Sequence, residues 1–151
     1  MLRLSRNTVD MVKKTAPAFK AYGVEIARLT YERLRADPRA SSVFDMKIFA
    51  NPERSHWFAE LMVMTIEHID DLDAFSSAAE EMSERHLKEG ITSAHYLYLA
   101  QAWPGAVRDV LGLGASDSVI DAWEETFWYL ANVLLTKKDE LQRVECFAKA
   151  A

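Results

Sequence analysis

The chain has 151 residues, of which 50% are hydrophobic and 27% are charged, and its formal net charge is −5. This balance is typical of a soluble globular domain, while an acidic chain without a basic block argues against nucleic-acid binding. No stretch reaches the roughly 18 to 20 apolar residues that a membrane span needs, and the first residues lack the apolar run of a signal peptide. The single Cys146 cannot form an internal disulfide, so we expect a reduced, cytoplasmic setting.

Helical patterns dominate the chain, because glycine and proline are scarce and no window alternates as a strand does. In chain order we expect six main helices, with a short turn at 38–44 before the third: 6–21, 23–36, 52–70, 75–89, 93–111 and 117–142. Residues 142–151 are expected to form a helix extension or a frayed tail, with a homodimer contact as an alternative. Without a linker or repeat, residues 1–151 are predicted to form one all-α domain, either a bundle or a globin-like packing.

Three of the predicted helix ends have a physical cause. Asp37 precedes Pro38, and a residue before proline is disfavoured in the helical region, so the second helix should end there. Asn51, Pro52 and Glu53 suit the start of the third helix, because asparagine caps free amides and proline fits the first helical position. Gly90 follows the fourth helix, where a left-handed residue commonly ends a helix.

A histidine continues the apolar stripe of the fourth predicted helix. The stripe consists of Phe75, Ala78, Ala79 and Met82, and His86 lies four residues beyond its last member. The charged neighbours are expected on the solvated side of the helix: Glu84, Arg85, Lys88 and Glu89. The pattern alone leaves two interpretations open, either a core histidine bonded to a carbonyl or a neutral imidazole that binds a metal or a haem iron.

The third predicted helix offers an apolar face with a cation at one end. Its members recur at spacings of three and four: Phe58, Leu61, Met62, Thr65, Ile66 and Ile69. Extending this face back by four residues reaches Arg54, whereas His56 points elsewhere and is expected on the surface. In the second helix, Tyr31 is in line with the apolar residues, where a buried tyrosine usually finds a partner for its hydroxyl.

Three separated motifs carry a resemblance to a known family. The run RHLKEGI at 85–91, followed by His95 and Tyr96, looks like the proximal-histidine segment of flavohaemoglobin globin domains and single-domain bacterial haemoglobins. The stretch from Val9 to Pro38, with Val43-Phe44-Asp45 after it, is similar to the opening helices of that family. The segment DAWEETFWYLANVLL at 121–135 is similar to its last helix. The resemblance covers most of the chain and implies a globin fold.

The resemblance also implies roles for individual residues around one b-type haem, which would lie between the helices at 52–70 and 75–89. His86 matches the proximal iron ligand, and Tyr31 matches the distal tyrosine that donates a hydrogen bond to the bound gas. Phe44 matches the phenylalanine that packs against the porphyrin, and Phe58 matches a distal apolar position. Leu61 and Met82 are expected to line the same pocket.

Two positions depart from the family pattern, and one supports it. Tyr96 matches the tyrosine that hydrogen-bonds the proximal histidine, but the glutamate of that network is replaced by Lys138. This replacement weakens the case for peroxidase-like activation. Arg54 stands where the family usually has glutamine. A cation there would favour anionic ligands, or it would turn outward to pair with the haem propionates.

The function that the resemblance implies is reversible binding of oxygen, nitric oxide or carbon monoxide, with nitric oxide dioxygenation as an extension. No Gly-rich dinucleotide fingerprint occurs in the 151 residues, so dioxygenation would depend on a separate reductase. Two alternatives remain open: a gas or redox sensor that signals to a partner protein, and a haem-less interaction module. The tryptophans at 57, 103, 123 and 128 are interpreted as core residues rather than an electron path.

Overall fold

The computed structural model describes residues 4–44, 51, 53–71 and 76–150, without the side chains of residues 76, 78, 138 and 144–150. Within these ranges the chain is helical and contains no strands, which confirms the predicted all-α class. In chain order the elements are α1 Arg6–Ala36, the 3-10 helix η1 Ala40–Ser42, α3 Glu53–Glu67, α4 Ser76–Glu89, α5 Ser93–Leu111, the 3-10 helix η3 Gly112–Gly114 and α6 Asp117–Ala150.

The first helix corrects the sequence prediction. We expected separate helices at 6–21 and 23–36, but α1 runs without a break from Arg6 to Ala36. Gly23 is buried inside it, and a Cβ atom built there would lie 3.6 Å from Ala59 Cβ and 3.7 Å from Met62 Cε, both on α3. Gly23 therefore marks a close crossing between two helices, and the predicted break there is wrong.

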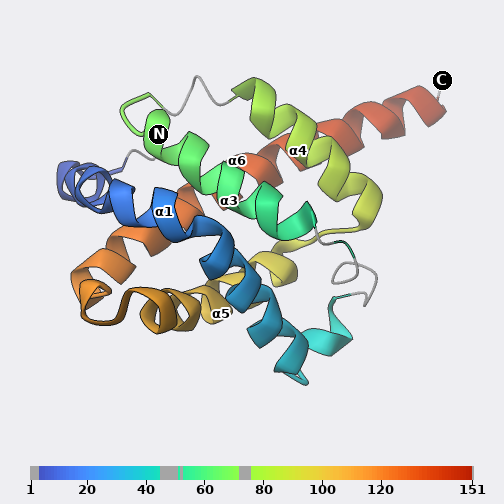
Figure 1. The fold of residues 1–151 in the computed structure, drawn as a ribbon. Helices are drawn as coiled ribbons and strands as arrows, with labels where there is room; N and C mark the ends of the chain where they lie inside the picture. The colour runs from blue at the N-terminus through green and yellow to red at the C-terminus, as the bar shows by residue number, and fades with distance from the viewer. Residues whose placement is uncertain (1–3, 45–50, 52, 72–75, 151) are drawn as a thin grey trace.

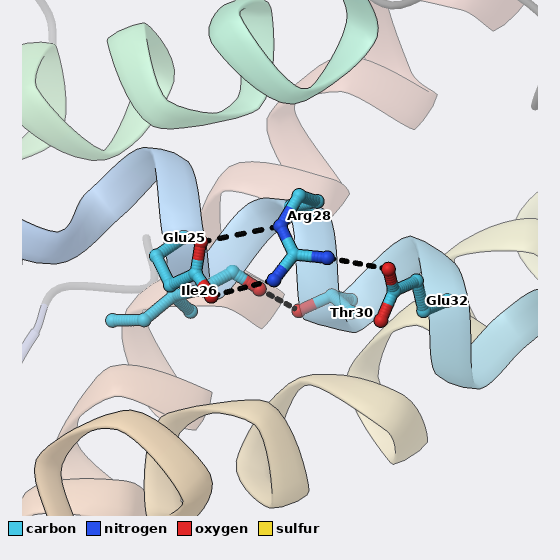
Figure 2. Close-up of polar contacts among 5 residues, drawn as sticks. All are labelled: Glu25, Ile26, Arg28, Thr30 and Glu32. Carbon is cyan, nitrogen blue, oxygen red and sulfur yellow. Dashed lines mark hydrogen bonds and ion pairs between the residues drawn. The ribbon is translucent and has the colours of Figure 1, made fainter.

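The outer surface of α1 carries a ladder of charges (Figure 2). Arg28 donates to both carboxylate oxygens of Glu25, at 2.6 and 3.2 Å, and to the carboxylate of Glu32. These spacings of three and four residues place the partners on one helix face, where exposed pairs add little stability. The buried Thr30 hydroxyl donates to the Ile26 carbonyl at 2.8 Å, so no polar group is left unsatisfied there.

The predicted helix ends with a physical cause are found in the structure. Asp37 follows α1 in an extended conformation and its amide donates to the Leu34 carbonyl. The Asn51 side-chain oxygen accepts a hydrogen bond from the Glu53 amide at 3.0 Å, as expected of a capping residue. Gly90 follows α4 with φ = 71°, which is the left-handed conformation that glycine adopts most easily.

Other boundaries differ slightly from the prediction. Helix α3 ends at Glu67, three residues before the expected end, and the predicted turn at 38–44 contains η1. Helix α6 continues to Ala150, so the backbone of residues 142–150 is a helix extension rather than a frayed tail. The homodimer contact considered for this tail stays a prediction. No helix among the described residues combines the length and the apolar character that crossing a membrane requires.

Two groups of buried apolar residues hold the helices together. The first joins α1, α3, α5 and α6, and contains Trp103 and Trp123, whose rings lie 5.8 and 4.0 Å from that of Phe19. This arrangement confirms that both tryptophans belong to the core. The second group connects α4 to α6 and α5, as Figure 1 shows for α4 lying across α6. The candidate site is lined mainly by members of the second group, and Phe58 of the first group also lines it.

Candidate functional site

One pocket collects side chains from α1, α3, α4, α5 and α6. About 850 Å³ of space not filled by protein atoms lies within and in front of it, open solvent included. The eight predicted site residues all line it: Tyr31, Phe44, Arg54, Phe58, Leu61, Met82, His86 and Tyr96. The prediction missed a further nine lining residues, which are Trp57, Arg85, Ile91, His95, Leu99, Phe127, Leu130, Ala131 and Leu134. The structure thus brings the predicted residues together, while their roles toward a cofactor stay predictions.

His86 is positioned by contacts on both of its sides along α4. One turn earlier, the fully buried Ser83 hydroxyl donates to the Leu134 carbonyl at 3.1 Å and fixes α4 against α6. After it, the His86 carbonyl accepts the Ile91 amide at 2.9 Å, a bond that the left-handed Gly90 makes geometrically feasible. The imidazole is therefore carried by the last turn of a helix whose direction is fixed by packing.

The His86 ring is in direct contact with Tyr96. The distance from His86 Nδ1 to the Tyr96 hydroxyl oxygen is 2.6 Å, and Tyr96 comes from the start of α5. Burial raises the pKa of Tyr96 above its ordinary value, so the phenol keeps its proton at neutral pH. The tyrosine that the sequence placed beside His86 therefore lies within hydrogen-bonding distance of it.

Tyr31 reaches the same pocket from α1. Its ring meets Phe58 of α3 edge to face, with the centroids 6.2 Å apart. Burial raises the pKa of Tyr31 to about 12; Arg54 acts against this shift, and Glu89 adds to it. Since the hydroxyl stays protonated at neutral pH, Tyr31 can donate a hydrogen bond inside the pocket.

Charged side chains form one part of the pocket wall: Arg54 and Arg85 line the pocket together with Trp57, and Glu89 pairs with Arg54. Arg54 Nη2 lies 2.7 Å from Glu89 Oε2, which links α3 to α4. The guanidinium carbons of Arg54 and Arg85 lie 5.8 and 4.5 Å from the centroid of the Trp57 ring. The sequence placed Arg85 and Glu89 on a solvated face. Glu89 is exposed as predicted, although it pairs with Arg54, whereas Arg85 is half-buried and lines the pocket, so the prediction is wrong for Arg85.

The remaining histidines differ from His86 in their surroundings. His56 is exposed, as predicted. His95 also lines the pocket, but its Nδ1 accepts the Thr92 amide at 2.9 Å at the start of α5, and its ring packs against Phe44. His95 therefore has a structural role at a helix end. The sequence carries a signal for this role, because Thr92 followed three residues later by the side-chain acceptor His95 forms a capping box at the start of α5.

The residues present fit a haem. Most of the pocket lining is apolar or aromatic, with a few polar groups among it, as is usual for cofactor sites. It offers the His86 imidazole, the Tyr96 hydroxyl beside that imidazole and the Tyr31 phenol from another helix, which is a donor set that suits a haem ligated by a single histidine. In addition, the buried Arg54 Nε has no hydrogen-bond partner among the described residues, so the pocket contains a donor that awaits an acceptor.

The comparisons with known proteins agree with this fold. The family model for globins matches residues 54–134. The chain belongs to the globin family, and haem and diatomic-gas binding are general properties of globins. The side chain at Lys138, where the family pattern has glutamate, lies outside the described residues.

Similar proteins are bacterial. A "Flavohemoprotein" of Xylella fastidiosa strain Temecula1 is 32% identical over 130 residues, covering 86% of this chain and 33% of its own length. The chain therefore spans about a third of the length of the flavohemoproteins it matches. An "Uncharacterized globin-like protein" of Aquifex aeolicus is 28% identical, covering 91% of this chain and 96% of its own.

Solved structures show the same fold. An engineered carbene transferase, from a "putative nitric oxide dioxygenase" of Rhodothermus marinus, has a TM-score of 0.83 at 28% identity, covering 95% of this chain and 99% of its own. A globin from Campylobacter jejuni has a TM-score of 0.77, covering 92% and 99% of the two chains. At 17% identity it supports the fold alone.

Proposed function

We propose that this globin holds one b-type haem between α3 and α4, with His86 as the iron ligand, and binds oxygen or another diatomic gas reversibly. The observation that carries the proposal is the 2.6 Å contact between His86 Nδ1 and the Tyr96 hydroxyl, inside a pocket that Tyr31 enters from another helix. We further propose that residues 1–151 act as one domain in the cytoplasm, where the single Cys146 stays reduced.

Tyr96 determines which nitrogen of His86 binds a metal. When Nδ1–H donates to the tyrosine oxygen, the proton is fixed on Nδ1 and the lone pair is on Nε2, which is the form that ligates iron. The same hydrogen bond holds the ring orientation and increases the basicity of the ligating nitrogen. Tyr96 is therefore a positioning residue for His86.

The other lining residues supply the gas site. A bound haem provides an iron whose remaining position takes a diatomic ligand. The apolar side chains around this space exclude water, among them Phe44, Phe58 and Leu61. Tyr31 supplies the hydrogen-bond donor, and a donor in such dry surroundings stabilises partial negative charge on the ligand more than water would.

Nitric oxide dioxygenation with a separate reductase is the catalytic activity we propose for the same site. The relatives supply the support, since one is called a putative nitric oxide dioxygenase and several are flavohemoproteins. We assign Tyr31 to catalysis in this proposal, because it lines the pocket and its hydroxyl stays protonated at neutral pH, as a donor to a reacting oxygen ligand must.

Haem binding and the ligand assignment are tested by spectroscopy. The purified chain should take up one equivalent of haem, with a Soret band that shifts on reduction and on addition of carbon monoxide. His86→Ala should lose most of the haem, whereas the exposed His56→Ala should keep normal spectra. A His86→Ala protein with an unchanged ferrous spectrum would show that another residue, with His95 tested next, holds the iron.

A further inference from the structure

Helix α4 carries His86 and has few buried side chains. Among its described side chains, only Ala79 and Ser83 are buried, at 1% and 0% exposure, and they lie four residues apart on one face. That face packs against α6, across which α4 lies in Figure 1. Because a helix with little buried apolar surface gains little from packing, polar contacts have a larger share in deciding where α4 lies.

The hydroxyl of Ser83 is used differently from those of three buried threonines. Thr30, Thr65 and Thr126 each donate to the carbonyl four residues earlier in their own helix. That local bond is a common one for a hydroxyl inside a helix. Ser83 instead donates to the Leu134 carbonyl of α6 at 3.1 Å, and both residues are buried. This bond therefore ties α4 to a second helix, in surroundings where a hydrogen bond is stronger than in water.

The bond lies close to His86 in the chain and in space. Ser83 precedes His86 by three residues, which is just under one helical turn, so the two side chains are neighbours on α4. Leu134, which offers the carbonyl, lines the same pocket as His86. From α5, Tyr96 contacts the His86 ring at 2.6 Å from Nδ1. One contact thus fixes the backbone that carries His86, and the other fixes its ring.

We propose that Ser83 is a positioning residue for the iron ligand, because its bond to Leu134 limits how far α4 can slide or turn against α6. His86 moves with α4, so this bond sets the tilt of the imidazole and its distance from a bound haem. Tyr96 does not do this alone, since a hydrogen bond to the ring leaves the helix axis free to shift. The inference rests on the proposed function, because it concerns the haem-loaded protein with His86 as the ligand.

The substitution Ser83→Ala tests this role. Alanine is the better helix former, and the Leu134 carbonyl keeps the amide partner that the α-helical pattern of α6 gives it, so the variant should fold. Resonance Raman spectroscopy of the ferrous protein shows the iron–histidine stretching band, which should broaden because the imidazole can take more orientations. Haem loss to an excess of apomyoglobin should become about two- to tenfold faster, the range for one neutral hydrogen bond.

The matched control is Thr30→Val. It also removes a buried hydroxyl that donates to a carbonyl, at 2.8 Å, but this bond lies within α1 and Thr30 is not among the residues that line the pocket. Its iron–histidine band and its haem loss should equal those of the unmodified protein, while urea unfolding should show a loss of stability. Tyr96→Phe gives a contrasting result: it should lower the frequency of the band, because the ligating nitrogen becomes less basic.

Two results would overturn the inference in distinguishable ways. If Ser83→Ala leaves the band and the haem loss unchanged, or if Thr30→Val reproduces its changes, the Ser83 bond only stabilises the fold and the proposed function stays intact. A chain that takes up no haem and shows no Soret band would overturn the proposed function, and the role of Ser83 with it.

Discussion

The two tyrosines of the pocket have different surroundings, although burial raises the pKa of both. Tyr96 has its hydroxyl within 2.6 Å of His86 and belongs to the side of the pocket that would hold the metal. Tyr31 packs against Phe58, and the charges that act on it are those of Arg54 and Glu89. One phenol thus lies against His86, and the other is the one that we propose as a donor to a ligand that enters the pocket.

Tyr31→Phe separates these two tasks. The substitution removes one hydroxyl and keeps the ring against Phe58, so the haem should remain bound with normal spectra. A hydrogen bond to a charged acceptor is worth about 1.5 to 3 kcal/mol, which predicts oxygen dissociation faster by roughly ten- to a hundredfold. The effect should be constant across the neutral pH range, since the pKa of about 12 keeps Tyr31 protonated.

Carbon monoxide dissociation is the control for this variant. Carbon monoxide takes up less negative charge than oxygen when bound, so its off-rate should change much less. Stopped-flow ligand replacement measures both rates. An oxygen off-rate that Tyr31→Phe leaves unchanged would mean that Tyr31 does not donate to the ligand, and Arg54→Leu should then show the effect instead.

Among the helices, Gly23 offers a direct test of the continuous α1. In a helix interior, alanine is more stable than glycine by roughly 0.5 to 1 kcal/mol, and an alanine Cβ at this site would meet Ala59 and Met62 at ordinary contact distances. Gly23→Ala should therefore raise the free energy of unfolding by about that amount. Gly23→Leu should lower it by about 1 to 3 kcal/mol, because the crossing with α3 has no room for the larger side chain.

Gly90→Ala is the matched control. It makes the same substitution at a residue with φ = 71° and open space around its Cβ position, so the conformational penalty of about 1 to 2 kcal/mol should appear alone and destabilise the protein. Urea unfolding of the three variants measures these differences. A destabilised Gly23→Ala protein would indicate that α1 bends or breaks at Gly23 after all.

The same glycine shows why part of the fold could not be predicted from the sequence. Helix ends with a local chemical cause were predicted correctly, as at Asp37, Asn51 and Gly90, because caps and left-handed residues depend on near neighbours. Gly23 carries a similar local signal for a helix end, although α1 continues through it. Gly23 instead lies where α1 crosses close to Ala59, 36 residues further along, and only the packed structure reveals that contact.

For the chain as a whole, local patterns predicted many of the residues of the candidate site, but they did not predict the contacts between helices. The apolar stripes and the family motifs identified eight lining residues, among them His86 and Tyr31. The pairing of Arg54 with Glu89 was missed because charged residues on a helix face normally point to solvent, and nothing in the sequence reveals that α3 and α4 bring these two side chains within 2.7 Å. Electrostatic partners on different helices require the tertiary structure.

Sustained nitric oxide dioxygenation depends on the chain together with a source of electrons. Converting nitric oxide and oxygen to nitrate takes up one electron for each nitrate formed, so sustained activity needs an electron donor. The 151 residues contain no Gly-rich dinucleotide fingerprint with which to bind NADH. We therefore expect a protein made of these residues to consume nitric oxide for one round and then stop, even with NADH present.

Adding a separate flavin reductase with NADH should restart consumption, measured with a nitric oxide electrode. The His86→Ala variant, which should lack haem, is the control for nitric oxide loss that does not depend on the site. Sustained consumption with NADH alone would contradict the need for an external reductase. Slow consumption even with the reductase would favour the sensor alternative, because a sensor needs to bind its gas and has no need to be re-reduced quickly.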